Sequence, residues 1–195
     1  MTEADYEQRI KKLDWFGLNQ LWADIKQKKT LVSGWAAGKA LEYLILRAFE
    51  LDSATVRYPY PVKIDGEVTE QIDGVIHLNG LSCLVEAKDY GREPDPNDPN
   101  DTDNGTNVNF EPIAKMRSQL LRRPGATIGS IFTTSGFTSP ALTLAKYLAP
   151  QTILLWEKSH LDVALQKQQI CSLVVRKYQW CVETGEPDFD VTLIP

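Results

Sequence analysis

The sequence has little of what a membrane protein, a disulfide-stabilised protein or a zinc protein requires. Among 195 residues there are three cysteines and two histidines. Cys83, Cys171 and Cys181 have neither the spacing of a zinc site nor the even number of a disulfide framework. No segment approaches the ~18 consecutive apolar residues of a membrane helix, and the first residues lack the apolar core of a signal peptide. We therefore expect a cytoplasmic protein with reduced thiols and no membrane partner.

Several common catalytic signatures are absent as well. There is no Walker loop, no Gly-rich dinucleotide fingerprint and no nucleophile elbow, and the sequence has no internal repeat. The composition is that of an ordinary globular protein, with 43% hydrophobic and 24% charged residues. A chain of this length suits one domain with a substantial core.

Positive charge is in deficit. The net charge of −5 and the pI of about 5.1 by themselves argue against a strongly basic nucleic-acid-binding protein. Many of the acids, however, lie in residues 89–109, a segment rich in Pro, Asn, Asp and Gly that predicts a long, acidic, mobile loop. The rest of the chain is near neutral. Basic residues cluster at two places there, which on the simplest interpretation are solvated helix faces: Lys26, Lys28 and Lys29, and Arg117, Arg122 and Arg123.

The most informative segment is residues 71–88, in which Asn79-Gly80 separates two β-prone runs. An Asn-Gly pair in this setting is the strongest short signal for a two-residue hairpin turn, because both turn positions need positive φ. Such a turn pairs Leu78 with Leu81, and the register of the whole hairpin follows by counting.

This register brings charged residues together at the far end of the hairpin. Asp73 is expected opposite Glu86 and Gln71 opposite Lys88, and directly paired residues have Cβ atoms only ~4.5–5.5 Å apart. Glu86 and Lys88 are two positions apart and therefore share a face. Two opposed carboxylates destabilise a sheet unless a cation lies between them. The alternative is a solvated strand face on which Lys88 merely offsets the acids.

The remaining segments predict an α/β fold. A helix over residues 35–51 carries Glu42 one step from its apolar stripe, where a surface glutamate is the default expectation. The other expected elements are helices at 5–13, 18–28, 110–121, 139–149, 159–167 and 170–182, and strands at 55–62, 127–134 and 152–156. Pro59 and Pro61 confine the strand at 55–62 to an edge or make its pairing irregular, and Asp65-Gly66 is a second hairpin-turn signal.

A three-strand meander that feeds a crossover helix gives a mixed sheet between helices, a three-layer α/β/α sandwich. We assign residues 1–195 to one domain, with a helical cap at 1–34 and C-terminal helices at 157–195.

These segments resemble the PD-(D/E)xK nuclease superfamily, the restriction-endonuclease-like fold. GKALEYLI, QIDGVI and LVEAKDY carry the likeness, and the order αβββαβ matches the core of that fold. GSIFTTSGFTSPALTLA is similar to the Mrr-like restriction endonuclease branch. Ile72 stands where the name of the superfamily has proline, and the acidic residues 89–109 place negative charge where DNA would approach.

The resemblance implies a metal-dependent active site. Asp73 and Glu86 would bind Mg²⁺, for which Mn²⁺ substitutes, and the carbonyl of Ala87 would complete the site. Lys88 would position the attacking water and stabilise charge on the phosphate. Glu42 resembles the helix-borne glutamate that orients a metal-bound water or aids a second ion.

The resemblance also bears on nucleic-acid contacts. Gln119 resembles a polar residue that the Mrr-like branch places near the site. The basic cluster Arg117, Arg122 and Arg123 on the same helix is a candidate for phosphate contacts.

We therefore expect a divalent-metal-dependent nuclease that hydrolyses DNA phosphodiester bonds, in restriction or another DNA-processing role. The alternative is a catalytically silent module of the same fold that binds DNA or a protein partner, and an effector that acts on RNA is a third hypothesis. A homodimer and an additional subunit for target selection are left open as partners.

Overall fold

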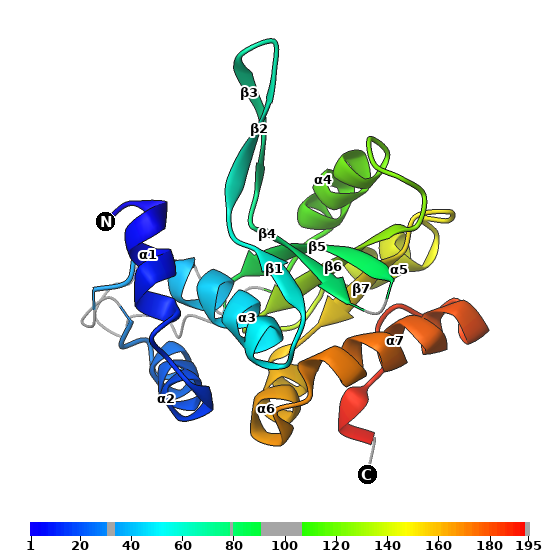
Figure 1. Cartoon of the computed structure of the whole chain (residues 1–195). Helices are drawn as coiled ribbons and strands as arrows, with labels where there is room; N and C mark the ends of the chain where they lie inside the picture. The colour runs from blue at the N-terminus through cyan, green and yellow to red at the C-terminus, as the bar shows by residue number, and fades with distance from the viewer. Residues whose placement is uncertain (31–33, 79, 91–106, 194–195) are drawn as a thin grey trace, which may run out of the picture.

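The structure is a computed structural model of the chain, and it describes residues 1–30, 34–78, 80–90 and 107–193. A five-stranded sheet with the order β1-β4-β5-β6-β7 forms its centre (Figure 1). β1, β4 and β5 are antiparallel neighbours, whereas β5, β6 and β7 are parallel, so the predicted mixed sheet is confirmed. The strands are β1 (Thr55–Arg57), β4 (Gly74–Leu78), β5 (Leu81–Lys88), β6 (Thr127–Thr133) and β7 (Ile153–Trp156).

Helices cover both faces of this sheet, which confirms the predicted α/β architecture. On one face lie α3 (Lys39–Leu51), α6 (Lys158–Lys167) and α7 (Ile170–Thr184). On the other face lie α4 (Glu111–Leu120) and α5 (Ser139–Lys146). Two N-terminal helices, α1 (Glu3–Ile10) and α2 (Trp15–Lys26), pack against α3 (Figure 1).

The core is divided by the sheet into two parts. Strands β6 and β7 are buried along almost their whole length, because helices cover both of their faces. Alternate residues go to opposite sides: Phe132 stacks on Trp156 on the α3 side, with ring centroids 5.2 Å apart. Ile131 and Leu155 are buried on the α4 side. Side-chain alternation thus decides which residues face which helices.

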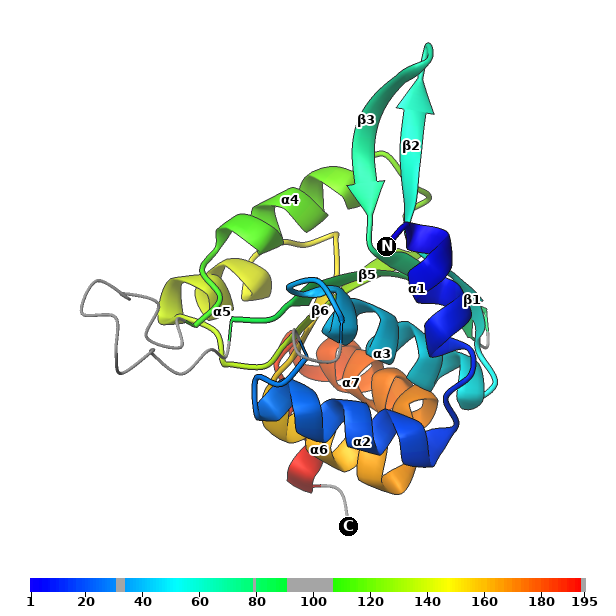
Figure 2. The ribbon, with the colours of Figure 1, turned by 90° about the vertical axis from the view of Figure 1, so that its left-hand side faces the viewer.

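The predicted three-strand meander is wrong in its first strand. Residues 55–62 are not one edge strand: β1 pairs with β4 in the sheet, whereas β2 (Tyr60–Ile64) pairs with β3 (Glu67–Ile72) in a separate two-stranded ribbon. This β2–β3 ribbon projects from the domain (Figure 2). Its strands are joined by Asp65-Gly66, with φ of +52° and +86°, which confirms the predicted turn.

The ribbon and the sheet pairing belong to one long bent hairpin. Arg57 pairs with Val75 in the sheet and Tyr60 pairs with Ile72 in the ribbon, which is the same register on both sides of the break. Pro59 lies at the break, and it has no N–H with which to continue a ladder.

The register predicted from the second hairpin is confirmed over β4 and β5, where Leu78 pairs with Leu81 and Gly74 with Val85. The predicted pairing of Gln71 with Lys88 is wrong, because Gln71 belongs to the ribbon and pairs with Pro61. The chain leaves the sheet one residue before Gly74, so the β4–β5 ladder stops there.

Most of the predicted acidic loop, residues 91–106, lies outside the described residues. Its final part is ordered against the domain. Val108 is fully buried and forms an isolated parallel bridge with Phe137, and its N–H donates to the carbonyl of Gly136 at 2.8 Å.

All three cysteines have free thiols. In the described part of the chain, no helix has both the length and the apolar character needed to cross a bilayer.

Gly74 is required by the close approach of α3 to the sheet. A Cβ at this position would lie 2.4 Å from Leu46 Cδ2 and 2.9 Å from Leu46 Cδ1. Gly74→Ala is therefore expected to lower the free energy of unfolding by about 1–3 kcal/mol, the usual cost of overpacking. Thermal unfolding would measure it, with Gly125→Ala as the control, because a Cβ there meets nothing within 4 Å. Equal melting temperatures for the two variants would contradict this account of Gly74.

Candidate active site

Asp73 lies at the bend where the β2–β3 ribbon meets the sheet. Its Oδ2 accepts a hydrogen bond from the backbone N–H of Ala87 on β5, at 3.1 Å, so its carboxylate reaches across to the strand that carries Glu86. Burial raises the pKa of Asp73, and the charge of Glu86 raises it further, against the hydrogen bond from Ala87. The two carboxyl groups therefore interact although the β4–β5 ladder ends at Gly74.

Glu86 is buried, with 1% of its surface exposed, and is held by two lysines. Lys88 Nζ lies 2.6 Å from Glu86 Oε1, and Lys115 Nζ on α4 lies 2.9 Å and 3.0 Å from the two carboxylate oxygens. Burial disfavours the charged form of Lys88, but the carboxylate of Glu86 outweighs it and the pKa of Lys88 is raised. Cations are thus already drawn to the oxygens of Glu86.

Glu42 is not the surface residue expected by default. It lies in the first turn of α3, is 7% exposed, and its carboxylate oxygens are 3.0 Å and 3.1 Å from Lys39 Nζ. Burial and the negative charge of Asp73 raise the pKa of Glu42 to about 7, although Lys39 opposes this. Glu42 can therefore hold or release a proton near neutral pH.

An open cavity of about 360 Å³ joins these groups. Glu42, Asp73, Ala87 and Lys88 line it together with Gly38, the N-cap residue of α3. The cavity thus lies where the start of α3, the ribbon bend and the end of β5 meet. Among the predicted catalytic residues, Glu86 lies behind this lining, covered by the two lysines.

The other predicted residues lie along α4 and its end. Gln119 is buried, and its Nε2 lies 3.5 Å from the carbonyl oxygen of Gln71 on the ribbon. Arg117 is exposed. Arg122 forms an ion pair with Glu70 of the ribbon.

Arg123 also contacts that carboxylate: its Nη2 lies 2.7 Å from Glu70 Oε2. Arg122 and Arg123 thus contact the ribbon and do not line the carboxylate cavity; their role in nucleic-acid binding stays a prediction.

Lys115 belongs to the site, although no sequence pattern singles it out. Its side chain is 46% exposed, and on α4 the buried apolar positions Ile113, Met116 and Leu120 are those that stand out in the sequence. A lysine next to an apolar stripe is common on amphipathic helices, so the sequence pattern does not indicate a site residue here. Only the approach of α4 to the end of β5 brings it to Glu86.

Removing the charge of Glu42 is expected to stabilise the protein at neutral and higher pH. The pKa of Glu42 in the folded state, about 7, lies above the ordinary value of 4.5. Between these two pH values the folded state binds more protons than the unfolded state. The free energy of unfolding therefore falls as the pH rises through this window. Glu42→Gln should raise the free energy of unfolding by roughly 1–3 kcal/mol at pH 8, and the gain should vanish toward pH 4.5.

Denaturant unfolding at several pH values would measure this effect. The exposed Glu183→Gln on α7 is the control for a change of net charge. A gain that does not depend on pH would show that the carboxylate of Glu42 is not the cause.

Comparison with known proteins gives likeness of structure only. No protein-family model matches the sequence, and no curated protein matches it. Among solved structures, a protein of unknown function, AF1548, is similar at 19% identity and a TM-score of 0.48, over 74% of this chain and 76% of that chain.

Two other similar structures are restriction endonucleases. The DNA modification-dependent restriction endonuclease AspBHI is 15% identical, with a TM-score of 0.48, over 86% of this chain and 40% of its own. The restriction endonuclease MspJI, in complex with a 27-mer oligonucleotide, is 17% identical, with a TM-score of 0.44, over 85% of this chain and 35% of its own. The chain thus spans less than half of these two enzymes.

Proposed function

We propose that this protein is a divalent-metal-dependent nuclease that hydrolyses phosphodiester bonds of DNA. The observation that carries the proposal is that Asp73, Lys88 and Glu42 meet at one cavity, from the ribbon bend, the end of β5 and the start of α3, with Glu86 behind its lining. Buried carboxylates that raise the pKa of a neighbouring carboxyl group, as Glu86 does for Asp73 and Asp73 does for Glu42, are costly to the fold. Such an arrangement favours a site that a cation completes.

The donor set fits a hard divalent cation. Among the described residues, no three His, Cys, Asp or Glu side chains form a group that could hold a metal. Mg²⁺ is commonly bound by only one or two carboxylates together with water and substrate phosphate. Asp73, Glu86 and the carbonyl of Ala87 would hold Mg²⁺ or Mn²⁺, and the ion would lower the pKa of water and polarise the phosphoryl oxygen.

The remaining residues supply positioning, charge and a proton acceptor. Lys88 reaches the edge of the cavity and would position the attacking water. Glu42, whose pKa of about 7 is near neutral, would accept the proton from that water. Lys115, which is more exposed than Lys88, would turn from Glu86 to the negative charge of the phosphate.

The likeness of GSIFTTSGFTSPALTLA to the Mrr-like branch makes a role in restriction or DNA processing the preferred one. A cut in both strands would require a second copy of the chain or a second cleavage event, and an additional subunit would account for target selection in an acidic chain.

One observation favours the alternative, a catalytically silent module. Lys88 and Lys115 together already neutralise Glu86, so the ion cluster can be stable without a metal. A silent module would bind nucleic acid or protein through the same surfaces and cut nothing.

A cleavage assay separates these functions. Supercoiled plasmid, linear duplex, single-stranded DNA and RNA would each be incubated with Mg²⁺, Mn²⁺ or EDTA. Nicked or linear plasmid with either metal and none in EDTA is the expected result. Cleavage of RNA alone would assign the chain to the RNA effectors, whereas binding without cleavage of any substrate would favour the silent module.

A further inference from the structure

A second cavity, of about 320 Å³, lies between the base of the β2–β3 ribbon and the end of α4. Val75 and Leu84, which pair with each other and are buried, form part of its lining, together with Tyr60 and Arg57 from the bent hairpin and Arg123 beyond α4. The proposed catalysis uses none of these residues. The cavity is therefore a candidate for a separate binding site.

This cavity shares a sheet face with Glu86. Side chains alternate along a strand, so Leu84 of the cavity lining lies on the same side of β5 as Glu86, two residues away. At ~3.4 Å per residue, the two positions are ~7 Å apart along the strand. Successive nucleotides of a B-DNA strand rise ~3.4 Å along the axis. The cavity is thus within a few nucleotides of the proposed cleavage site.

The lining is cationic in an otherwise acidic protein. Arg57 is exposed, and its guanidinium lies 3.5 Å from the centroid of the Tyr60 ring, so the aromatic side chain supports it. Arg123 and Arg122 share the single carboxylate of Glu70, which leaves that group with a net positive charge.

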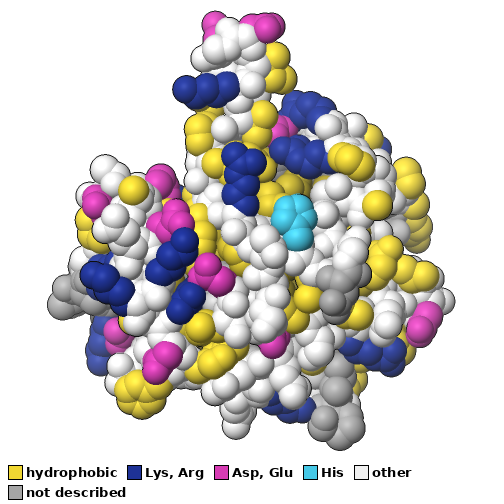
Figure 3. All heavy atoms as spheres, viewed as in Figure 1, with side chains coloured by type: hydrophobic (Ala, Val, Ile, Leu, Met, Phe, Trp, Pro, Cys, Tyr) yellow, Lys and Arg dark blue, Asp and Glu magenta, His cyan; other side chains and the backbone are white. Residues whose placement is uncertain are grey.

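No carboxylate belongs to the lining among the described residues. Figure 3 shows Lys and Arg side chains gathered above His77, over the ribbon base and the end of α4.

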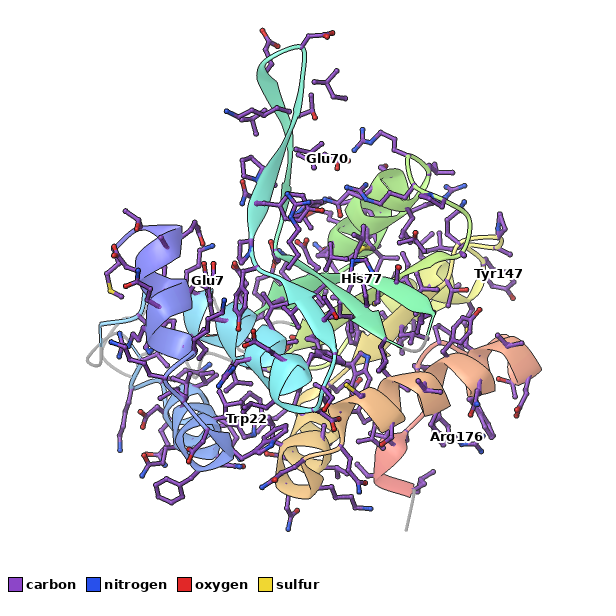
Figure 4. All side chains as sticks on the ribbon, in the orientation of Figure 1. Glu7, Trp22, Glu70, His77, Tyr147 and Arg176 are labelled. Carbon is purple, nitrogen blue, oxygen red and sulfur yellow. The ribbon has the colours of Figure 1, made fainter. Side chains whose placement is uncertain are left out.

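His77 adds a fixed polar group to this lining. Its Nδ1 is 2.9 Å from Ser82 Oγ on β5, which orients the ring and leaves Nε2 for a ligand. Figure 4 shows Glu70 beside the ribbon near α4, with His77 below it on β4. The cavity therefore combines an apolar floor, a guanidinium plane and several hydrogen-bond donors.

We propose that this cavity binds a nucleotide unit, an unpaired base together with its phosphate. The face of a base can stack on the Arg57 guanidinium plane over the apolar floor, as bases do on arginine and aromatic side chains in nucleic-acid complexes. Arg123 and His77 would contact the phosphate. A base within a duplex stack hides both faces, so the occupant is an unpaired base. The ligand is either a nucleotide of the strand being cut, in which case the inference rests on the proposed function, or a free nucleotide.

Binding of a fluorescein-labelled single-stranded DNA 12-mer in EDTA tests this without any cleavage. Arg57→Glu is expected to weaken binding about tenfold, the typical loss of one stacked base. Arg176→Glu is the matched control: it makes the same charge change on α7, away from the ribbon, and Arg176 also lies over an aromatic ring, 5.8 Å from Phe189 (Figure 4). This control should bind as the wild type does. If Arg57→Glu unfolds the protein, His77→Glu is tested in its place. His77 is an exposed residue elsewhere in the cavity lining.

Two further ligands, an abasic strand and AMP, test whether the cavity binds a base and whether that base belongs to a strand or to a free nucleotide. An abasic strand of the same length keeps the phosphates but has no base to stack, so Arg57→Glu should weaken its binding much less than that of the normal strand. Competition by AMP would identify a free nucleotide as the ligand, and failure of AMP to compete would identify the strand. Equal weakening by Arg57→Glu and Arg176→Glu, or an Arg57 effect of the same size on the abasic strand, would overturn the proposal. Because no metal is present, this result does not depend on whether the protein cleaves DNA.

Discussion

Replacing Lys88 by alanine is expected to reduce metal-dependent DNA cleavage by about a hundredfold or more, the usual cost of removing a group that stabilises transition-state charge. Lys88 Nζ lies 2.6 Å from Glu86 Oε1 at the edge of the cavity, so it is placed to act on water and phosphate together. Asp73→Asn is expected to cause a similar or larger loss, because it removes one of the two proposed carboxylate ligands. Both variants should remain folded, since neither side chain belongs to the apolar core.

Plasmid nicking in Mg²⁺ and in Mn²⁺, with initial rates measured for each variant, would check this expectation. Lys146→Ala is the control, because Lys146 is a surface lysine on α5 whose partner, Glu186, is also exposed. Nicking at the wild-type rate by both Lys88→Ala and Asp73→Asn would refute the proposed active site. Loss of activity with a large fall in melting temperature would instead reveal a structural role.

Mg²⁺ or Mn²⁺ is expected to stabilise the wild-type protein against heat and to have no such effect on Asp73→Asn. A ligand at 100 times its Kd adds about 2.7 kcal/mol to the free energy of unfolding. For a chain of this length that corresponds to a rise in Tm of about 5–10 °C. Without metal, Asp73→Asn should be more stable than the wild type. Burial and the charge of Glu86 disfavour the ionised carboxylate of Asp73 and raise its pKa, and the neutral amide avoids both costs.

Thermal unfolding with increasing metal, followed by EDTA, would measure both effects. Glu183→Gln removes an exposed carboxylate on α7 and should keep the full metal-dependent shift. A shift of the same size in Asp73→Asn would show that the metal binds elsewhere. A lower metal-free Tm for Asp73→Asn than for the wild type would show that the Ala87 hydrogen bond outweighs the carboxylate repulsion.

The local elements could be predicted from sequence because their signals are short-range. The Asn-Gly pair predicted the register of β4 and β5 from turn chemistry alone, and Asp65-Gly66 likewise predicted the ribbon turn. Buried strands β6 and β7 were predicted because both segments are short and contain no charged residue, as strands covered on both faces do. In each of these cases, residues adjacent in the chain decide the outcome.

The path of the long bent hairpin could not be predicted in the same way. Pro59 indicated irregular pairing, but residues 55–62 read equally well as one edge strand. After Arg57 the chain leaves the sheet and enters the ribbon. The break lies opposite Asp73, between the β1–β4 pairing and the first pair of the ribbon. The position of Asp73 at that bend, outside any ladder, is a consequence of this break.

By itself, the sequence determined the mixed α/β architecture, the β4–β5 register and the set Asp73, Glu86 and Lys88 as candidate site residues. These follow from periodicity and turn chemistry, which act between near neighbours. Only the tertiary structure decided that Glu42 is buried beside Asp73 with a pKa of about 7 and that Lys115 reaches Glu86. Burial and charge proximity depend on how α3 and α4 pack against the sheet, and no local pattern encodes those distances.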